Sequence, residues 1–112
     1  MATTLQEQYD RARQVMPGGV NSSVRLNKAL GVPLYVERAR GSRVWDLEGR
    51  SFIDMCMAHG AALLGHAHPA VDRAVRRSVE IGYVNSFETV YHEELARKIC
   101  QCVPCADRIR FC

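Results

Sequence analysis

The 112-residue sequence has no long apolar run, no apolar leader and no concentrated block of basic residues. A membrane-spanning helix needs about 18–20 consecutive apolar residues, and no segment here approaches that length. The opening residues MATTLQEQYD are polar and acidic, whereas a secretory leader is basic and then apolar. These absences predict a soluble, cytoplasmic protein with no membrane partner. The sequence leaves an organellar location open as an alternative.

The charge is also low and dispersed, with 15 basic against 12 acidic residues and a formal net charge of +3. Nucleic-acid binding requires a concentrated basic face, so we expect no nucleic-acid partner. The composition is 47% hydrophobic and 24% charged, which is ordinary for a globular protein with a core and argues against extensive disorder.

General catalytic signatures are missing as well: the chain has no GxGxxG, no GxxxxGK[ST] and no GxSxG. Its five cysteines are an odd number, and without a leader we expect reduced thiols, packed as small apolar side chains. Metal binding is disfavoured because Cys100 and Cys102 are two residues apart on an expected helix and point in opposite directions. For the histidines His59, His66 and His68 we favour a hydrogen-bonded turn over a metal site.

What the sequence does contain is a helix, a small antiparallel sheet, two further helices and the start of a strand. Thr4 and Glu7 have capping-box spacing, and Pro17 ends the first helix. The expected elements are strands at 33–37, 43–47 and 50–55, helices at 69–82 and 89–103, and a strand beginning at 107. This order predicts an α/β fold. A single terminal strand cannot form a sheet, so we expect the chain to stop within a domain.

The loop PGGVNSSVR, residues 17–25, combines two glycines, an asparagine and two serines, and it ends on Arg25. Such residues commonly form a simple turn, because glycine and asparagine adopt backbone angles that other residues resist. The residues alone leave open whether the loop is only a turn or presents Arg25 to a ligand.

Three motifs in register carry a family resemblance: PGGVNSSVR, then the hairpin D-x-x-G-x-x-x-I-D at 46–54, then LGHAHP at 64–69. Together they resemble the N-terminal region of class III pyridoxal-phosphate-dependent aminotransferases, and within that class the glutamate-1-semialdehyde 2,1-aminomutase group. The resemblance implies a truncated PLP-dependent transferase of fold type I. Residues 1–57 would form the helix, substrate loop and small sheet, and residues 58–112 the incomplete start of the large PLP-binding domain.

The resemblance also implies roles for individual residues. Arg25 would receive the substrate carboxylate, in a loop shaped by Asn21 and Ser22. His59 and Gly60 would lie near the cofactor or substrate. The LGHAHP motif would be structural, through Gly65, His66, His68 and Pro69. His59 stands where the aminomutases carry a tryptophan, and residues 83–89 also depart from their pattern, so a related amino acid or amino ketone is an alternative substrate.

The same family needs a Schiff-base lysine and a phosphate-binding loop. The two lysines present, Lys28 and Lys98, match no position of that catalytic lysine. We therefore expect no catalytic residue, no retained PLP and no activity in this chain alone, whereas the whole enzyme would act on a small amino substrate as a homodimer. The alternative is a non-catalytic interaction protein, a truncated paralogue that pairs with a full-length relative.

Overall fold

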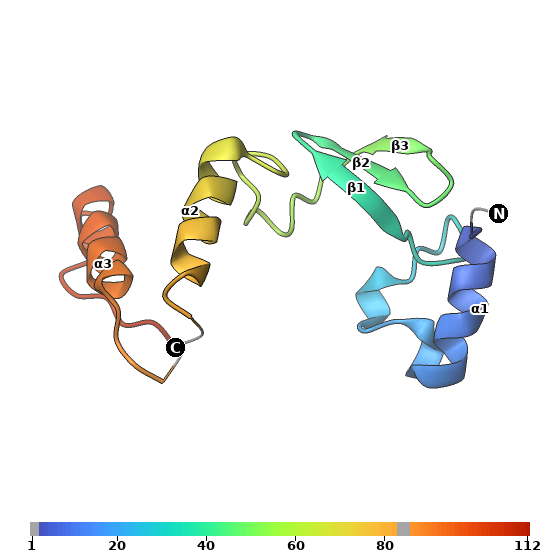
Figure 1. Ribbon diagram of the computed structural model, residues 1–112, viewed down its shortest axis with the longest axis horizontal. Helices are drawn as coiled ribbons and strands as arrows, with labels where there is room; N and C mark the ends of the chain where they lie inside the picture. Colours follow the sequence, from blue (N-terminus) through green and yellow to red (C-terminus); the bar gives the residue numbers. More distant parts are fainter. Residues whose placement is uncertain (1–2, 83–85) are drawn as a thin grey trace. The chain divides into compact units, whose positions relative to one another are not determined.

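A computed structural model describes residues 3–82 and 86–112, and its internal contacts define two compact units, Met1–Arg73 and Ala74–Cys112. Figure 1 shows the elements in chain order. They are α1 (Leu5–Val15), the 3-10 turns η1 (Pro17–Gly19) and η2 (Ser23–Arg25), β1 (Val36–Arg40), β2 (Arg43–Asp46), β3 (Ser51–Ile53), α2 (Pro69–Val79) and α3 (Val90–Cys102). The expected domain boundary after residue 57 stays a prediction.

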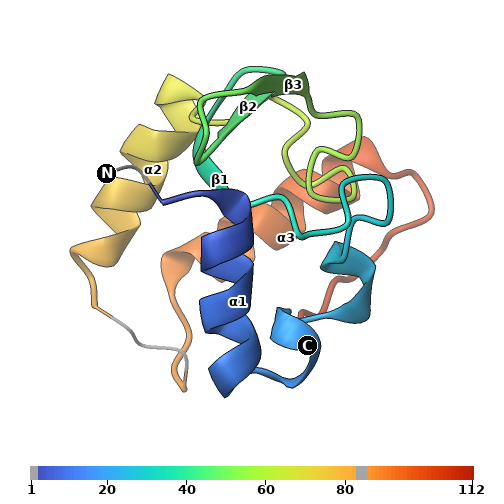
Figure 2. The same ribbon diagram turned by 90° about the vertical axis from the view of Figure 1, so that its right-hand side faces the viewer.

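Helix α1 begins and ends where the sequence predicts. The Glu7 N–H donates to Thr4 Oγ1 at 3.1 Å, and the Thr4 N–H donates to the Glu7 carboxylate at 2.9 Å. This reciprocal pair satisfies two of the donors that a helix N-terminus leaves free. Leu5 and Ala12 are the buried residues of the helix. In Figure 2, α1 is seen along its length, followed by the two 3-10 turns.

The three strands form one antiparallel sheet in the order β1-β2-β3. Ala39, Val44 and Phe52 are paired in register and share one face, on which Val44 is 8% exposed. The predicted first strand at 33–37 is wrong in position, because pairing runs over Val36–Arg40 and a register shift separates Val36 from Arg38. The position is set by the tight reversal at Gly41, which has a φ of +58° and joins Arg40 to Arg43.

A buried carboxylate closes the β2–β3 hairpin. Asp46 is 0% exposed, and its Oδ1 accepts the N–H groups of Glu48 and Arg50 at 3.0 and 2.8 Å. The Arg50 Nε donates to Oδ2 at 2.7 Å. Burial acts to raise the pKa of Asp46, but the hydrogen bonds from Arg50 and Glu48 outweigh it, so the pKa lies below its ordinary value. The hairpin predicted from Glu48-Gly49 is confirmed, with Gly49 at a φ of +79°.

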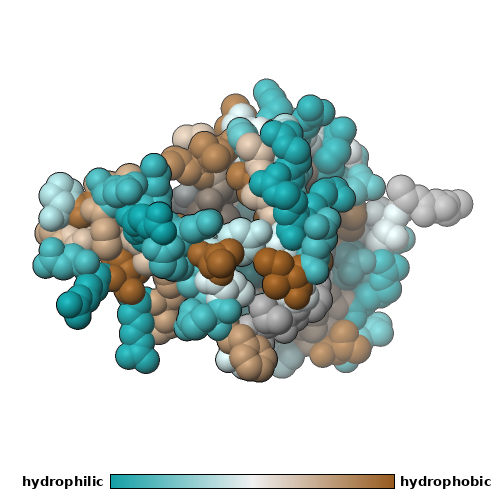
Figure 3. Space-filling model, turned by 60° about the vertical axis from the view of Figure 1, so that its left-hand side comes forward, coloured by the Kyte–Doolittle hydropathy of each residue, from teal (hydrophilic) through white to brown (hydrophobic). Residues whose placement is uncertain are grey.

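Both later helices carry apolar stripes that are about half-exposed. On α2 the stripe is Val71, Val75 and Val79, each between 43% and 52% exposed. On α3, Tyr91 is 43% and Leu95 is 52% exposed. Figure 3 shows apolar side chains lying open among polar ones on one face of the molecule. The helices themselves were predicted correctly to within three residues, and Thr89 is the N-cap of α3 as expected.

Two expectations, one for residues 107–112 and one for the cysteines, are wrong. Residues 107–112 form no strand, because no other segment of the described chain offers them a partner. The cysteines are free thiols, as expected, but four of them are exposed rather than packed as apolar side chains, and Cys100 is only half-buried. In the parts of the chain that are described, no three metal-binding side chains gather and no helix is long and apolar enough to cross a bilayer.

Candidate functional site

The loop 17–25 folds back against the end of α1. Gly18 and Gly19 have φ of +65° and +69°, in the left-handed region that favours glycine. A side chain at Gly19 would place its Cβ 2.5 Å from the Tyr9 ring, so only glycine fits this approach. The Tyr9 hydroxyl donates to the Gly18 carbonyl at 3.3 Å. The glycines therefore give the loop a defined path.

The same loop ends in η2, which presents Arg25. The Arg25 N–H donates to the Ser22 carbonyl at 2.9 Å, and Ser22 is the N-cap residue of the turn. Arg25 is exposed, and among the ion pairs of residues 3–82 and 86–112 it has none. A guanidinium without a carboxylate partner remains able to bind an incoming carboxylate through two parallel hydrogen bonds.

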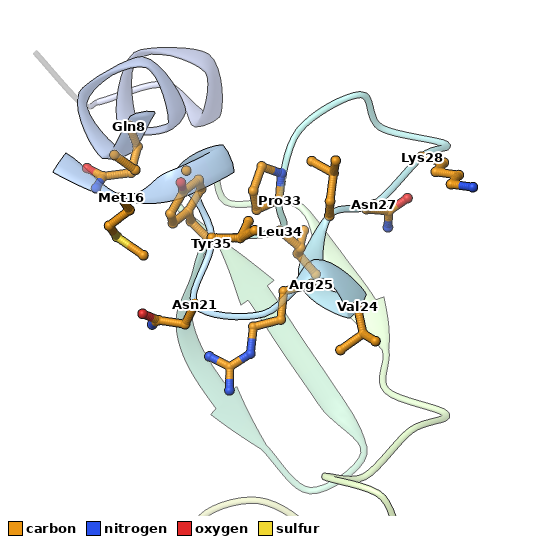
Figure 4. Close-up of a pocket in the computed structure, with 14 residues that line it drawn as sticks. Gln8, Met16, Asn21, Val24, Arg25, Asn27, Lys28, Pro33, Leu34 and Tyr35 are labelled. Carbon is orange, nitrogen blue, oxygen red and sulfur yellow. The ribbon is translucent and has the colours of Figure 1, made fainter. Parts of the chain in front are cut away.

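Arg25 and Asn21 both line an open pocket of about 740 Å³ between α1, the loop and the chain leading into β1. In Figure 4 these two side chains lie at one end of the pocket, and Lys28 lies at the other end and points away. The remaining wall is largely apolar, formed by side chains such as Met16, Val20, Val24, Leu26, Pro33 and Leu34. No Asp or Glu among the described residues lines it, and Ser22 does not line it either.

A buried hydroxyl also belongs to this pocket. The Tyr35 ring lines the wall, and its hydroxyl oxygen is buried without a hydrogen-bond partner in the described structure. Burial, with Tyr9 nearby, raises the pKa of Tyr35 above its ordinary value, so the hydroxyl stays protonated and can donate. Sequence reasoning missed Tyr35, and its signal would have been the single tyrosine in the apolar segment that precedes β1.

A second turn follows β3 and is organised by Asp54. Its Oδ1 accepts the N–H groups of Cys56 and Met57 at 2.8 and 3.0 Å, and its Oδ2 lies 2.7 Å from His66 Nε2. The hydrogen bond from the Met57 N–H, followed by those from His66 and the Cys56 N–H, holds the pKa of Asp54 below its ordinary value. The carboxylate is therefore ionised near neutral pH, and His66 Nε2 donates to it.

The turn that Asp54 caps is left-handed over consecutive residues. Met57, Ala58 and His59 have φ of +47°, +52° and +56°, and Gly60 follows at +91°. Left-handed backbone costs about 1–2 kcal/mol for each residue with a Cβ. Such strain persists only where surrounding contacts impose it, and it is concentrated at functional sites.

His59 projects from this turn as an exposed side chain. Its Nδ1 lies 3.9 Å from Cys56 Sγ, a weak contact within the turn. Within the described residues Nε2 has no hydrogen-bond partner, so it can face a ligand. The Gly60 N–H donates to the Met57 carbonyl at 3.0 Å and closes the turn.

The LGHAHP segment joins this turn to the sheet. Gly65 has a φ of +90°, and a Cβ there would lie 3.1 Å from Gly41 Cα. His66 and Gly41 exchange two backbone hydrogen bonds of 2.9 Å. The His68 carbonyl accepts the Asp72 N–H at 3.0 Å as α2 begins at Pro69, and His68 Nδ1 is buried with no partner in the described chain. These contacts tie the motif to the reversal between β1 and β2, and the structural role expected of it stays a prediction.

The predicted site residues thus fall into two groups within the first unit. Arg25 and Asn21 share the pocket, whereas His59 and Gly60 belong to the turn after β3, and no hydrogen bond in the described chain joins the two groups. The sequence pattern contained Asp54 only as the last residue of a hairpin motif, and its capping role was missed. Residues 83–85, part of the segment that departs from the family pattern, lie outside the described residues.

Comparison with known proteins defines the class. The family model for class III aminotransferases matches residues 26–112, more than half of the chain. The chain therefore belongs to the class III aminotransferase family.

Particular relatives narrow this placement. A glutamate-1-semialdehyde 2,1-aminomutase of Chloroflexus aurantiacus is 43% identical over 107 residues, which are 95% of this chain and 24% of that protein. An ω-transaminase of Sphaerobacter thermophilus superposes with a TM-score of 0.86 at 27% identity, covering 95% of this chain and 24% of that one. A transaminase solved with PLP bound superposes with a TM-score of 0.77 at 29% identity, and the match covers 89% of this chain and 24% of that one. The chain thus spans about a quarter of the length of the relatives it matches.

Proposed function

We propose that this chain supplies the substrate-carboxylate end of a PLP-dependent aminotransferase or aminomutase whose remaining parts lie outside these 112 residues. The observation that carries the proposal is Arg25, an exposed guanidinium without an ion-pair partner in the described chain, at one end of a pocket that no carboxylate lines. Asn21 lies at the same end and adds an amide, and the Ser22 carbonyl fixes the turn that presents Arg25.

His59 adds a second contact in this proposal. Its Nε2 has no hydrogen-bond partner among the described residues, and it can donate to or accept from a polar group of the substrate or cofactor. A tryptophan in the same place could only donate. The substrate is accordingly an amino acid or amino-aldehyde that carries a carboxylate, and glutamate semialdehyde is one candidate among related compounds.

The residues present do not make up a PLP site. PLP supplies an electron sink for bonds at the amino carbon, and it needs a lysine and an acidic partner for its ring nitrogen. Lys28 lies at the edge of a pocket that no described Asp or Glu lines, and its side chain points away from that pocket, while Lys98 lies on α3. We therefore propose that the 112-residue chain alone neither binds PLP covalently nor transaminates. A PLP absorbance band in the isolated chain, abolished in Lys28→Ala or Lys98→Ala, would refute this part.

The role of Arg25 is tested in a full-length chimera. The matching quarter of the Chloroflexus aurantiacus aminomutase would be replaced by this chain, and kcat and KM measured for Arg25→Gln and for the control Arg11→Gln on the exposed face of α1. Because a charge-assisted pair to a carboxylate is worth about 1.5–3 kcal/mol, KM in Arg25→Gln should rise by roughly 10- to 100-fold. An unchanged KM in Arg25→Gln would show that the carboxylate binds elsewhere.

A second function has its own support. The open stripes of α2 and α3 suit a protein that pairs with a full-length relative without catalysing anything itself. Co-purification of this chain with an intact relative, without a change in that enzyme's activity, would favour this alternative.

A further inference from the structure

The turn bearing His59 has an unusual energetic requirement. Three consecutive residues with side chains, Met57, Ala58 and His59, adopt left-handed backbone angles, a conformation that L-residues adopt only as isolated exceptions. Such a turn does not persist through local preference, so other groups must hold it.

The groups that hold the turn converge on Asp54. Its Oδ1 accepts two consecutive N–H groups, those of Cys56 and Met57, at the entrance to the turn. Its Oδ2 accepts from His66 Nε2 at 2.7 Å, and His66 lies beyond the end of the turn. One carboxylate therefore ties together the entrance and exit of the segment 56–66.

The far end of this arrangement is anchored to the sheet. His66 exchanges two backbone hydrogen bonds with Gly41, and the Asp54 N–H donates to the Ser42 carbonyl at 2.8 Å. Gly41 and Ser42 form the reversal between β1 and β2. Asp54 and His66 thereby fix the position of the His59 turn relative to the sheet.

We infer that Asp54 is a positioning residue that acts through His59: its carboxylate, braced by His66, holds the left-handed turn that presents the His59 ring to the ligand. The ligand part of this inference rests on the proposed function, whereas the turn part depends only on the chain itself. Asp54 touches no reacting atom in this account, and its effect reaches the ligand through the placement of His59.

The turn is tested by NMR on the 112-residue chain. In Asp54→Ala the N–H groups of Gly60 and Ala62, which donate to Met57 and neighbouring carbonyls, should exchange about tenfold faster or more, because a charged acceptor of two hydrogen bonds is lost. Asp54→Asn keeps an acceptor for both N–H groups and should retain most of the protection. The amides of Val44 and Trp45 report whether the sheet stays folded in each variant.

A strain-relieving substitution sharpens the test. Ala58→Gly removes the left-handed penalty at one position, so it should restore part of the protection lost in Asp54→Ala. Ala61→Gly is the matched control, since Ala61 is outside the residues with positive φ and should restore nothing. Equal protection in the wild-type chain and Asp54→Ala, with the sheet folded, would overturn the turn part of the inference.

The ligand part is tested by a double-mutant cycle in the full-length chimera. Asp54→Ala and His59→Ala should each raise KM, and Asp54→Ala should add no further increase in a His59→Ala background, because both remove the same contact. Fully additive effects would overturn the inference that Asp54 acts through His59. If His59→Ala leaves KM unchanged, the proposed role of His59 fails, and the exchange data still decide whether Asp54 holds the turn.

Discussion

In the segment from Asp46 to His66, two carboxylates of the segment cap its own turns, whereas α2 and α3 carry apolar stripes that remain about half-exposed. In the first region, two carboxylates accept hydrogen bonds from four backbone N–H groups and bind Arg50 and His66 as well. In the second, Val75 and Leu95 are each 52% exposed. Turn chemistry is local and can be complete within one short segment, but a hydrophobic core needs surfaces from distant parts of a chain.

The largest expected effect comes from removing the carboxylate that closes the hairpin. Asp46→Ala leaves two N–H groups and Arg50 without their acceptor in a fully buried position. Arg50 is 47% exposed and keeps Glu48 as a partner, so the cost comes from the three lost hydrogen bonds to a charged acceptor, each worth about 1.5–3 kcal/mol, and the sheet should be destabilised by at least about 3 kcal/mol. Urea unfolding followed by the fluorescence of Trp45, the sole tryptophan, measures this. Asp10→Ala on the exposed face of α1 is the control, and a similar loss in both variants would contradict the account.

A smaller effect is expected where the LGHAHP segment meets the sheet. Gly65→Ala combines a left-handed φ with a Cβ that would lie 3.1 Å from Gly41 Cα, and it should cost about 2–3 kcal/mol. Gly31→Ala has a similar φ of +70° but nothing within 4 Å, so it should cost only about 1–2 kcal/mol. The difference between the two variants isolates the close approach of the two backbones. Equal free energies of unfolding for both would show that the approach is unimportant.

The pH dependence of the same region follows from its carboxylates. The native pKa values of Asp46 and Asp54 both lie below the ordinary aspartate value of about 3.9. Their stabilisation is therefore complete above about pH 4 and is lost as the pH falls through the lowered native values. NMR titration of the carboxyl carbons, with amide signals of the turn and sheet, measures both events. Loss of the turn well above pH 4 would show that another group controls it.

The second region should respond least. Leu95→Gln changes a side chain that is 52% exposed, so the unfolding free energy of this chain should shift by no more than about 0.5 kcal/mol. Val44→Ala, in the buried face of the sheet, should cost about 2 kcal/mol by comparison. A large loss in Leu95→Gln would mean that the stripe of α3 is already covered in the isolated chain.

The sequence predicted much of this fold because its strongest signals are local. Thr4, Pro17, Pro69 and Thr89 bound the helices through backbone chemistry that involves only neighbouring residues. The first strand was displaced because its position depends on pairing across the Gly41 reversal, which no single segment encodes. Residues 107–112 have the alternation of a strand but lack a partner strand in the described chain.

The candidate site was predictable only in part for the same reason. The residues around Arg25 left a simple turn and a ligand loop both open, and only the family resemblance implied a substrate loop; the structure adds the pocket and the absence of any lining carboxylate among the described residues. The sequence motif contained Asp54 but did not predict its role as a cap. Its hydrogen bonds with Met57 and His66 join residues three and twelve positions away, a pairing that only the folded chain shows. The Tyr35 hydroxyl could be recognised as unpartnered only from its burial.

The proposal that most needs a test is that the half-exposed apolar stripes of α2 and α3 pack against surfaces outside these 112 residues, since the chain spans about a quarter of its relatives' length. The most direct test mixes the chain with the Chloroflexus aurantiacus aminomutase lacking its matching quarter, and measures hydrogen exchange along α2 and α3 together with PLP absorbance. The account predicts a one-to-one complex in which the amides of both helices become protected and a PLP band is recovered. Helices that exchange equally fast with and without the complementing protein would contradict it.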